Sequence, residues 1–565
     1  MERLIIYQLF PRIFTNTSEN RIAGGSLQQN GSGKLNDLTE DVLISLKQLG
    51  VNCLWLTGVI EHATKTDFSE YGIPADNPNI VKGEAGSPYA IKDYYDIDPA
   101  IAEDIPQRMR EFEALVKRAH ANRLRVVIDF VPNHTARVYR SDNSPAGTED
   151  FGTRDDINMN FTPNNNYYYI SNQQFYPDFP LDSEGKEPYV EFPAKATGND
   201  CFTAFCGRND WYETVKLNYG HDYLSGEDNF DPIPDTWFKM LDILKFWASK
   251  GVDGFRCDMV FMVPLAFWHW VIPQVKALYP HVFFIGEIYD VGLYRPFLDY
   301  GDFDYLYDKV NLYDTLVGIE TKGWSAAQLT GCWQTVDGIG DRMLNFLENH
   351  DEVRFASPSF AGDAMRVVPY LVTSTMMSKG PVLIYYGQEL GEKGVDNEGF
   401  AGNNHRTTIF DYWTVDTLRR WYNNGKPGDE KLTQHEKWLR KLYSKVLNLC
   451  NESRALREVG FFDLMYANLR QEDFDPHSIF CFIRYVKDEI VIVVVNFSNR
   501  PLKNLKINVP HEAFEMCGLP KGETVAEDLL WGRKHRLFLS PVAPMNIEIN
   551  ASDALVLSIK SKENN

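Results

Sequence analysis

Residues 251–260, G-V-D-G-F-R-C-D-M-V, decide the fold class of this chain. A short apolar stretch leads to Arg256 and Asp258, whose spacing places both side chains on one face of an extended strand. Because a cation beside a carboxylate lowers the pKa of that carboxylate, we expect Asp258 to be ionised, as a carboxylate nucleophile must be. The alternative is a buried Arg–Asp pair that only braces the strand.

The same order, an apolar strand and then an amphipathic helix, recurs along most of the chain. Other strands are predicted at residues 4–8, 51–56, 124–131, 283–287, 343–347 and 382–386. Helices are predicted from a cap at Asn36 or Asp37 to residue 49, and at 106–120, 235–250, 365–377 and 434–449. Continuous apolar strands in a β-then-α rhythm of about eight repeats predict a closed (β/α)8 barrel of the TIM type.

Two segments interrupt this rhythm. Residues 135–234 are rich in Asn, Asp, Gly, Pro and Tyr, and a structureless loop of that length would be unusual, so we expect an inserted subdomain whose aromatic residues line a cleft. From residue 460 onward, strands at 478–485 and 490–497 flank a short polar turn, which predicts an antiparallel β domain. The predicted organisation is barrel (1–134), insert (135–234), barrel (235–459) and C-terminal β-sandwich (460–565).

Composition limits the partners. The 565 residues carry a formal net charge of -21 and no Lys- or Arg-rich run, which opposes binding to nucleic acid or to an anionic membrane and favours an uncharged substrate. No sequence feature predicts an oligomeric state. The eight scattered cysteines are expected to be reduced, although Cys201 and Cys206 could pair in an oxidising compartment.

The N-terminal residues lack a signal-peptide pattern, and no apolar run is long enough to span a membrane. The chain as given is therefore expected in the cytoplasm. Removal of a leader from a longer precursor would instead place it in the periplasm or outside the cell.

Four predicted strands end in or near acidic residues. These residues are Asp129, Asp258, Glu287 and Asp351. Since active sites of parallel barrels lie at the carboxyl ends of the strands, we expect these carboxylates to converge, where like charges raise one another's pKa. One ionised and one protonated carboxyl group are the minimal equipment for glycoside hydrolysis.

Two histidines, His134 and His350, accompany the acids. Both can hydrogen-bond to sugar hydroxyls. A metal-binding role is the alternative, but the two histidines lack a ligand-like spacing such as i, i+4, so we place it second.

Ordered motifs along the chain resemble those of the α-amylase family, glycoside hydrolase family 13. They are Y-Q-L-F-P-R-I-F at 7–14, S-P-Y-A-I-K-D-Y at 87–94, D-F-V-P-N-H at 129–134, V-K-L-N at 215–218, G-F-R-C-D at 254–258, G-E-I at 286–288, N-H-D at 349–351 and I-Y-Y-G-Q-E at 384–389. The resemblance implies a barrel, a subdomain inserted after the third strand and a C-terminal β domain.

The resemblance also implies a catalytic set. Asp258 corresponds to the nucleophile, Glu287 to the acid and then base, and Asp351 to the carboxylate that stabilises the transition state. Arg256 would orient Asp258. The implied reaction is retaining hydrolysis of α-1,4 bonds in maltodextrins or starch fragments.

For substrate binding, the resemblance implies that His134 and His350 bind hydroxyls while Tyr89 stacks on the sugar ring. Asp129 matches a bracing residue, and Asn133 matches a residue that often holds calcium in the family. No cofactor is required on this interpretation. Calcium at Asn133 and a purely hydrogen-bonding Asn133 both stay open.

The chain departs from many α-amylases after the nucleophile, where Phe261 and Met262 replace a Lys-His pair. The V-K-L-N segment resembles that of the cyclomaltodextrinase and neopullulanase branch more than that of other branches. Two alternatives to hydrolysis follow: a transglycosylase with a drier acceptor side, and a non-catalytic carbohydrate-binding barrel, which the three carboxylates disfavour.

Overall fold

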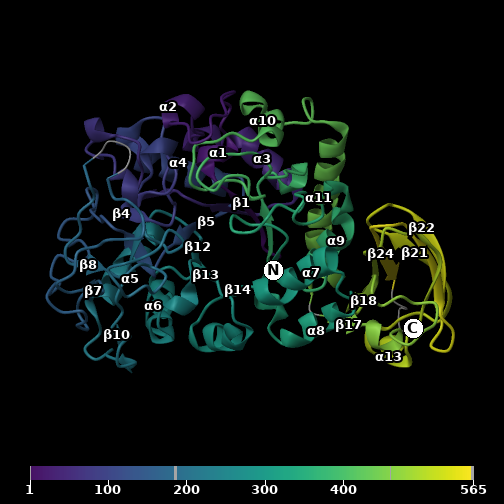
Figure 1. The fold of residues 1–565 in the computed structure, drawn as a ribbon. Helices are drawn as coiled ribbons and strands as arrows, with labels where there is room; N and C mark the ends of the chain where they lie inside the picture. Colours follow the sequence, from purple (N-terminus) through teal and green to yellow (C-terminus); the bar gives the residue numbers. More distant parts are fainter. Residues whose placement is uncertain (1, 183–186, 459, 561–565) are drawn as a thin grey trace.

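A closed parallel barrel forms the centre of the molecule. The structure, a computed structural model, describes residues 2–182, 187–458 and 460–560. The eight strands lie in the spatial order β1, β16, β15, β14, β13, β12, β5 and β2, so sequential strands are neighbours and the barrel closes between β1 and β16. Figure 1 labels β1, β5, β12, β13 and β14 around the middle of the molecule. The predicted fold class is confirmed.

Seven of the eight barrel strands fall on predicted strands. Their bounds are Ile5–Leu9 (β1), Cys53–Leu56 (β2), Arg125–Phe130 (β5), Gly254–Cys257 (β12), Phe283–Gly286 (β13), Met343–Phe346 (β15) and Val382–Tyr385 (β16). The eighth, β14 at Tyr305–Tyr307, was not predicted. Three residues are too few for periodicity to show a strand.

Helices pack around the strands. Five of them fall on predicted helices: α3 (Glu40–Leu49), α4 (Arg108–Ala121), α5 (Asp235–Ser249), α9 (Val368–Met376) and α11 (Gln434–Glu452). Four other main helices were not predicted: α6 (Leu265–Leu278), α7 (Asp314–Lys322), α8 (Gln328–Thr335) and α10 (Asp416–Tyr422). The predicted cap of α3 was wrong: Thr39, not Asn36 or Asp37, accepts the hydrogen bond from the Val42 amide.

Between β5 and α5 the chain forms small antiparallel ribbons rather than further barrel units. The first, β6 (His134–Ala136), pairs with β9 (Thr214–Lys216); β7 (Tyr169–Ile170) pairs with β8 (Ala194–Lys195), and β10 (His221–Asp222) with β11 (Glu227–Asp228). This segment lies on one side of the barrel, at the left of Figure 1. Another ribbon, β3 (Ile60–His62) with β4 (Ile91–Ile97), follows β2.

The C-terminal part is antiparallel, as predicted. Its six-stranded sheet has the order β17, β18, β19, β24, β21, β22, and β20 pairs with β23. The bounds are Gly460–Asp463, Ile479–Val486, Glu489–Asn496, Leu502–Ile507, Gly522–Asp528, Lys534–Leu539, Met545–Ile549 and Asp553–Lys560 for β17 to β24, with α13 at His511–Cys517. In Figure 1 this sheet lies on the side of the barrel opposite the insert.

The boundaries at 134/135, 234/235 and 459/460 stay predictions. Residues 1, 183–186, 459 and 561–565, which fall in the predicted segments, lie outside the described residues. All eight cysteines are free, so the Cys201–Cys206 alternative is not realised. Among the described residues, no helix combines the length and apolarity that crossing a bilayer requires.

Candidate active site

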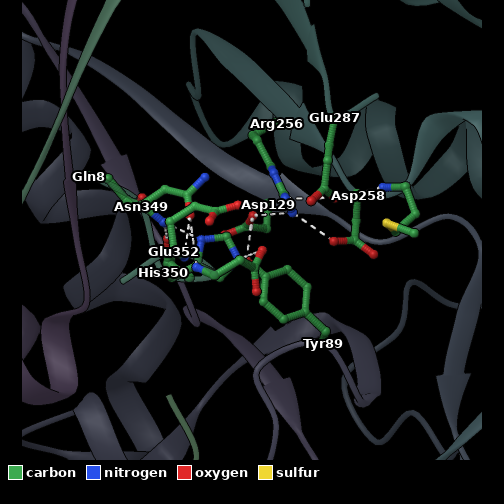
Figure 2. Close-up of polar contacts among 12 residues, drawn as sticks. Gln8, Tyr89, Asp129, Arg256, Asp258, Glu287, Asn349, His350 and Glu352 are labelled. Carbon is green, nitrogen blue, oxygen red and sulfur yellow. Dashed lines mark hydrogen bonds and ion pairs between the residues drawn. The ribbon is translucent and has the colours of Figure 1, made fainter. Parts of the chain in front are cut away.

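Arg256, fully buried on β12, is the centre of a carboxylate cluster at the carboxyl ends of the strands. One terminal nitrogen, Nη1, donates to Asp258 Oδ1 at 2.7 Å and to Asp129 Oδ1 at 3.3 Å, while Nη2 lies 2.7 Å from Glu287 Oε2. Figure 2 shows the guanidinium between these three acids. A single cation therefore faces three carboxylates drawn from β5, β12 and β13.

The charge of Asp258 differs from the prediction. Burial and the adjacent Glu287 carboxylate raise the pKa of Asp258 well above its usual range, and Arg256 only partly opposes them. The prediction that Asp258 is held ionised beside Arg256 was therefore wrong for the free protein. Glu287 is thus close enough to Asp258 to oppose its ionisation.

Glu287 is held by donors from two sides. The amide of Met259 donates to Oε2 at 2.9 Å, and the Tyr289 hydroxyl donates to Oε1. Met259 adopts the left-handed conformation with φ 44°, which is uncommon for a residue with a side chain. This backbone turn directly after Asp258 is what aims the amide at Glu287.

Asp351 lies across the cluster beside His350. Burial alone would raise the pKa of Asp351, but His350, 3.1 Å away, together with Arg256 and Arg406 holds it well below its usual range. Its side chain is 41% exposed, so it is open to a ligand. Asp351 is therefore an anion throughout the neutral range.

His350 is fixed from three directions. Its Nδ1 is 2.9 Å from Gln8 Nε2 and its Nε2 is 2.6 Å from the Tyr89 hydroxyl, while the Tyr89 ring stacks on the imidazole at 5.2 Å. Since the Gln8 amide nitrogen can only donate, Nδ1 is the acceptor. Tyr89 thus lies in the cluster, where its hydroxyl and its ring both contact His350. Its stacking on a sugar ring stays a prediction.

His134, on β6, reaches the same cleft from the insert side. Burial, with a smaller contribution from the Lys216 ammonium, lowers the pKa of His134 to about 3, so its ring is neutral. Trp211 lies against it at 5.3 Å, which confirms the prediction that an aromatic residue of the insert lines the cleft.

The cleft has a volume of about 350 Å³. Its walls include Tyr89, His134, Trp211, Asp258, Glu287, Tyr289, His350, Asp351 and Arg406. Six of the seven residues predicted for catalysis and substrate binding line this one cavity, and the seventh, Arg256, lies behind the acids.

Asn133 does not fit a calcium ligand here. Its Oδ1 accepts a hydrogen bond from Lys216 Nζ, and its Nδ2 donates to the Gly198 carbonyl at 2.7 Å. The same ammonium contacts Asp200 at 2.7 Å and the Met262 carbonyl at 3.1 Å. Because the amide oxygen already faces a cation, the tentative assignment of Asn133 to calcium is corrected to the hydrogen-bonding alternative.

Several residues of the site were missed in the sequence. Tyr289 could have been found, because it follows Glu287 by two residues and so shares its face in extended chain. Arg406 and Tyr307 could not have been found in this way. Arg406 lies in a polar loop. Tyr307, whose hydroxyl accepts a hydrogen bond from Arg256 Nε at 3.1 Å, lies on β14, the strand that was not predicted.

The chain is similar in sequence to known proteins. The chain is 26% identical over 406 residues to alpha-amylase 3 of Dictyoglomus thermophilum, covering 69% of this chain and 64% of that protein. It is 24% identical over 466 residues to cyclomaltodextrin glucanotransferase of Bacillus licheniformis, covering 74% and 56%. The match thus spans less than two thirds of either relative.

A solved structure has the same fold. The noncanonic maltogenic alpha-amylase of Thermotoga neapolitana superposes with a TM-score of 0.63 at 19% identity, over 99% of both chains. The family model described as alpha amylase, catalytic domain, matches residues 8–459. Since this match covers well over half of the chain, and includes the whole carboxylate cluster, the protein belongs to the alpha-amylase family.

Proposed function

We propose that this protein is a retaining glycoside hydrolase that cleaves α-glucosidic bonds, mainly α-1,4, in maltodextrins or starch fragments. The observation that carries this proposal is the convergence of Asp258, Glu287 and Asp351 on one cleft around Arg256. One carboxyl group that donates a proton and a second that attacks or stabilises the sugar are the basic requirement for acid-assisted glycoside cleavage. No metal or organic cofactor is needed for these steps.

In the first step Glu287 protonates the glycosidic oxygen as Asp258 Oδ attacks the anomeric carbon. The bond to the leaving sugar breaks, its electron pair takes the proton, and a glycosyl ester forms on Asp258. Glu287, now ionised, removes a proton from water, whose oxygen displaces Asp258. Two inversions at the same carbon retain the anomeric configuration.

Glu287 must be the proton donor for this sequence to begin. In the ligand-free arrangement Glu287 accepts hydrogen bonds from the Met259 amide and the Tyr289 hydroxyl and contacts Arg256. A substrate oxygen entering the cleft offers Glu287 an acceptor for its proton. Asp351, ionised throughout, then stabilises the positive charge that develops on the ring.

The substrate class follows from the walls of the cleft. Tyr89 and Trp211 supply aromatic faces, while His134 and His350 supply ring nitrogens for hydroxyl groups. A chain with a net charge of -21 favours a neutral oligosaccharide. The names of the relatives, an alpha-amylase and a cyclomaltodextrin glucanotransferase, support an α-glucan.

Transglycosylation is the second candidate, supported by one observation. Phe261 is 36% exposed and lies 6.2 Å from Tyr289, ring to ring, so an apolar surface adjoins the acid/base residue. An apolar acceptor side disfavours water relative to a sugar. The same covalent intermediate would then pass to a sugar hydroxyl.

Replacement of the nucleophile tests the proposal. Asp258→Asn should lower kcat on maltoheptaose at least about 1,000-fold, because the amide cannot form the glycosyl ester. Asp242→Asn, on the exposed face of α5, is the matched control and should retain wild-type kcat. Wild-type activity in Asp258→Asn would remove Asp258 from the mechanism.

Product analysis of the wild-type protein separates the two candidates. Products shorter than maltoheptaose, released first as α-anomers, support hydrolysis with retention. Oligosaccharides longer than maltoheptaose at early times support transfer. Release of β-anomers would overturn the retaining mechanism in either form.

A further inference from the structure

A second carboxylate cluster lies outside the catalytic cleft, on the ribbon of β3 and β4. Glu61 of β3 is opposite Asp93 of β4, whereas the preceding Ile60 is opposite Ile97, so residues 94–96 form a bulge. Bulges redirect side chains that regular strands would send to opposite faces. Here the bulge places Asp96 beside Glu61.

Asp142, from the segment after β6, completes the cluster. One carboxylate oxygen from each of Glu61, Asp96 and Asp142 lies within 4.8 Å of the other two. Glu61 and Asp96 are buried, at 2% and 0% exposure, while the Asp142 side chain is 33% exposed. The cluster therefore has a buried floor and one face open to water.

One carboxylate oxygen of Glu61 is buried without a hydrogen-bond donor among the described residues. Its Oε2 is inaccessible to solvent and has no hydrogen-bond partner in the described part of the chain. The neighbouring acids are partly satisfied: Asp96 pairs with Arg108, and Asp93 accepts from the amides of Tyr95 and Asp142 at 2.7 and 3.0 Å. A buried carboxylate oxygen without a donor is costly unless something else meets it.

The local charges do not balance. Glu61, Asp93, Asp96 and Asp142 are faced by Arg108, which is 4.0 Å from Asp142, and by Lys92. Lys92, however, is already bound to Asp76 at 3.0 Å and to the Pro74 carbonyl. A bound cation would relieve this excess of negative charge.

We propose that Glu61, Asp96 and Asp142 form a calcium-binding site at the ribbon of β3 and β4, outside the cleft. All donors are carboxylate oxygens, which calcium prefers, and a spread of up to 4.8 Å between them suits a cation with bonds of about 2.4 Å. Magnesium, with bonds of about 2.1 Å and strict octahedral geometry, fits this spread less well. Water reaches the remaining positions from the exposed side of Asp142.

The ion would join two parts of the chain that form the cleft. Glu61 and Asp96 belong to the ribbon that follows β2, and Tyr89 lies two residues before β4. Asp142 belongs to the segment that follows β6, and β6 begins with His134, which lines the cleft. Calcium would thus stabilise the relative placement of two cleft walls, without touching the substrate.

The site is tested on the full-length protein after treatment with EDTA. We expect calcium at about 100-fold above its Kd to raise Tm by about 2–5 °C, and titration calorimetry to show binding. Glu61→Gln, which removes the charge but keeps the shape, should weaken calcium binding at least about tenfold and abolish the rise in Tm. Magnesium should produce a smaller rise.

Two further variants keep the test decisive. Asp142→Asn changes an exposed side chain and should fold even where Glu61→Gln does not, and it too should weaken calcium binding. Asp308→Asn removes another buried acid, which directly follows β14 and is not part of the cluster, and should retain the full calcium response. Absence of calcium binding in the wild-type protein, or unchanged affinity in both Glu61→Gln and Asp142→Asn, would overturn the proposal.

Discussion

At the scale of single residues, the surroundings of a side chain decide its charge more than its sequence neighbours do. Arg256 follows the prediction and contacts Asp258 at 2.7 Å. The pKa of Asp258 is nevertheless raised, because Glu287, 29 positions further along the chain, adds a second negative charge to the same buried space. Spacing along one strand could not reveal that second charge.

The stability of the protein in acid should depend on His134. Its folded pKa of about 3 lies below the unfolded value of about 6.5, so between these values the unfolded state binds more protons and stability falls as the pH falls. From pH 8 to pH 4.5 this group alone should cost about 2–3 kcal/mol. His134→Gln should lose that much less stability than wild type over the same interval, measured from urea midpoints.

The exposed His511 provides the control for this prediction. His511→Gln should lose stability between pH 8 and pH 4.5 to the same extent as wild type. An identical pH dependence in wild type and His134→Gln would contradict a neutral, buried His134.

At the scale of elements, a local signal can mark the end of a helix, whereas a strand of three residues has no such signal. Gly251, with φ 93°, directly follows the cap of α5, where a left-handed residue commonly ends a helix. By contrast, β14 has only three residues, yet it closes the barrel and supplies Tyr307 to Arg256. Its existence depends on pairing with β13 and β15 rather than on its own sequence.

Helix α11 offers a local test. Thr433 caps it in a reciprocal pair with Glu436: the Thr433 side chain accepts from the Glu436 amide, and Glu436 accepts from the Thr433 amide. Because Thr433 is exposed, Thr433→Ala should cost about 1 kcal/mol of local stability without loss of packing. Amide exchange at the first turn of α11 should then be about fivefold faster.

Thr433→Ser retains the hydroxyl and should exchange at the wild-type rate. Equal rates in wild type and Thr433→Ala would show that the cap contributes nothing to this helix end.

At the scale of the whole molecule, one buried cation connects the insert to the barrel. Lys216 on β9 contacts Asn133 after β5, the Met262 carbonyl after β12, and Asp200 within the insert. It is 2% exposed, and burial lowers its pKa, which Asp200 opposes. The Lys216 ammonium thus occupies the position beside the Asn133 amide oxygen where a metal ion would bind.

Loss of this ammonium should loosen the insert. Lys216→Met keeps the aliphatic stem but leaves three acceptors without their donor, so we expect a loss of about 2–4 kcal/mol in the free energy of unfolding. Urea midpoints measure it, with the partly exposed Lys245→Met on α5 as the control that should change little. A Lys216→Met protein as stable as wild type would contradict this bridging role.

The sequence by itself determined the barrel, the antiparallel C-terminal part and most residues of the carboxylate cluster. Strand periodicity and strand-end acids are local features, and a parallel barrel brings all its strand ends to one face. Membership in the alpha-amylase family followed from the same motifs.

Only the tertiary structure decided the charge of Asp258, the role of Tyr307 and Tyr289 around the acids, the ammonium at Asn133 and the Glu61–Asp96–Asp142 cluster. Each depends on groups far apart in sequence that burial brings within a few ångströms. Coulomb interactions and desolvation act through space, so their sum is set by packing and not by the order of residues.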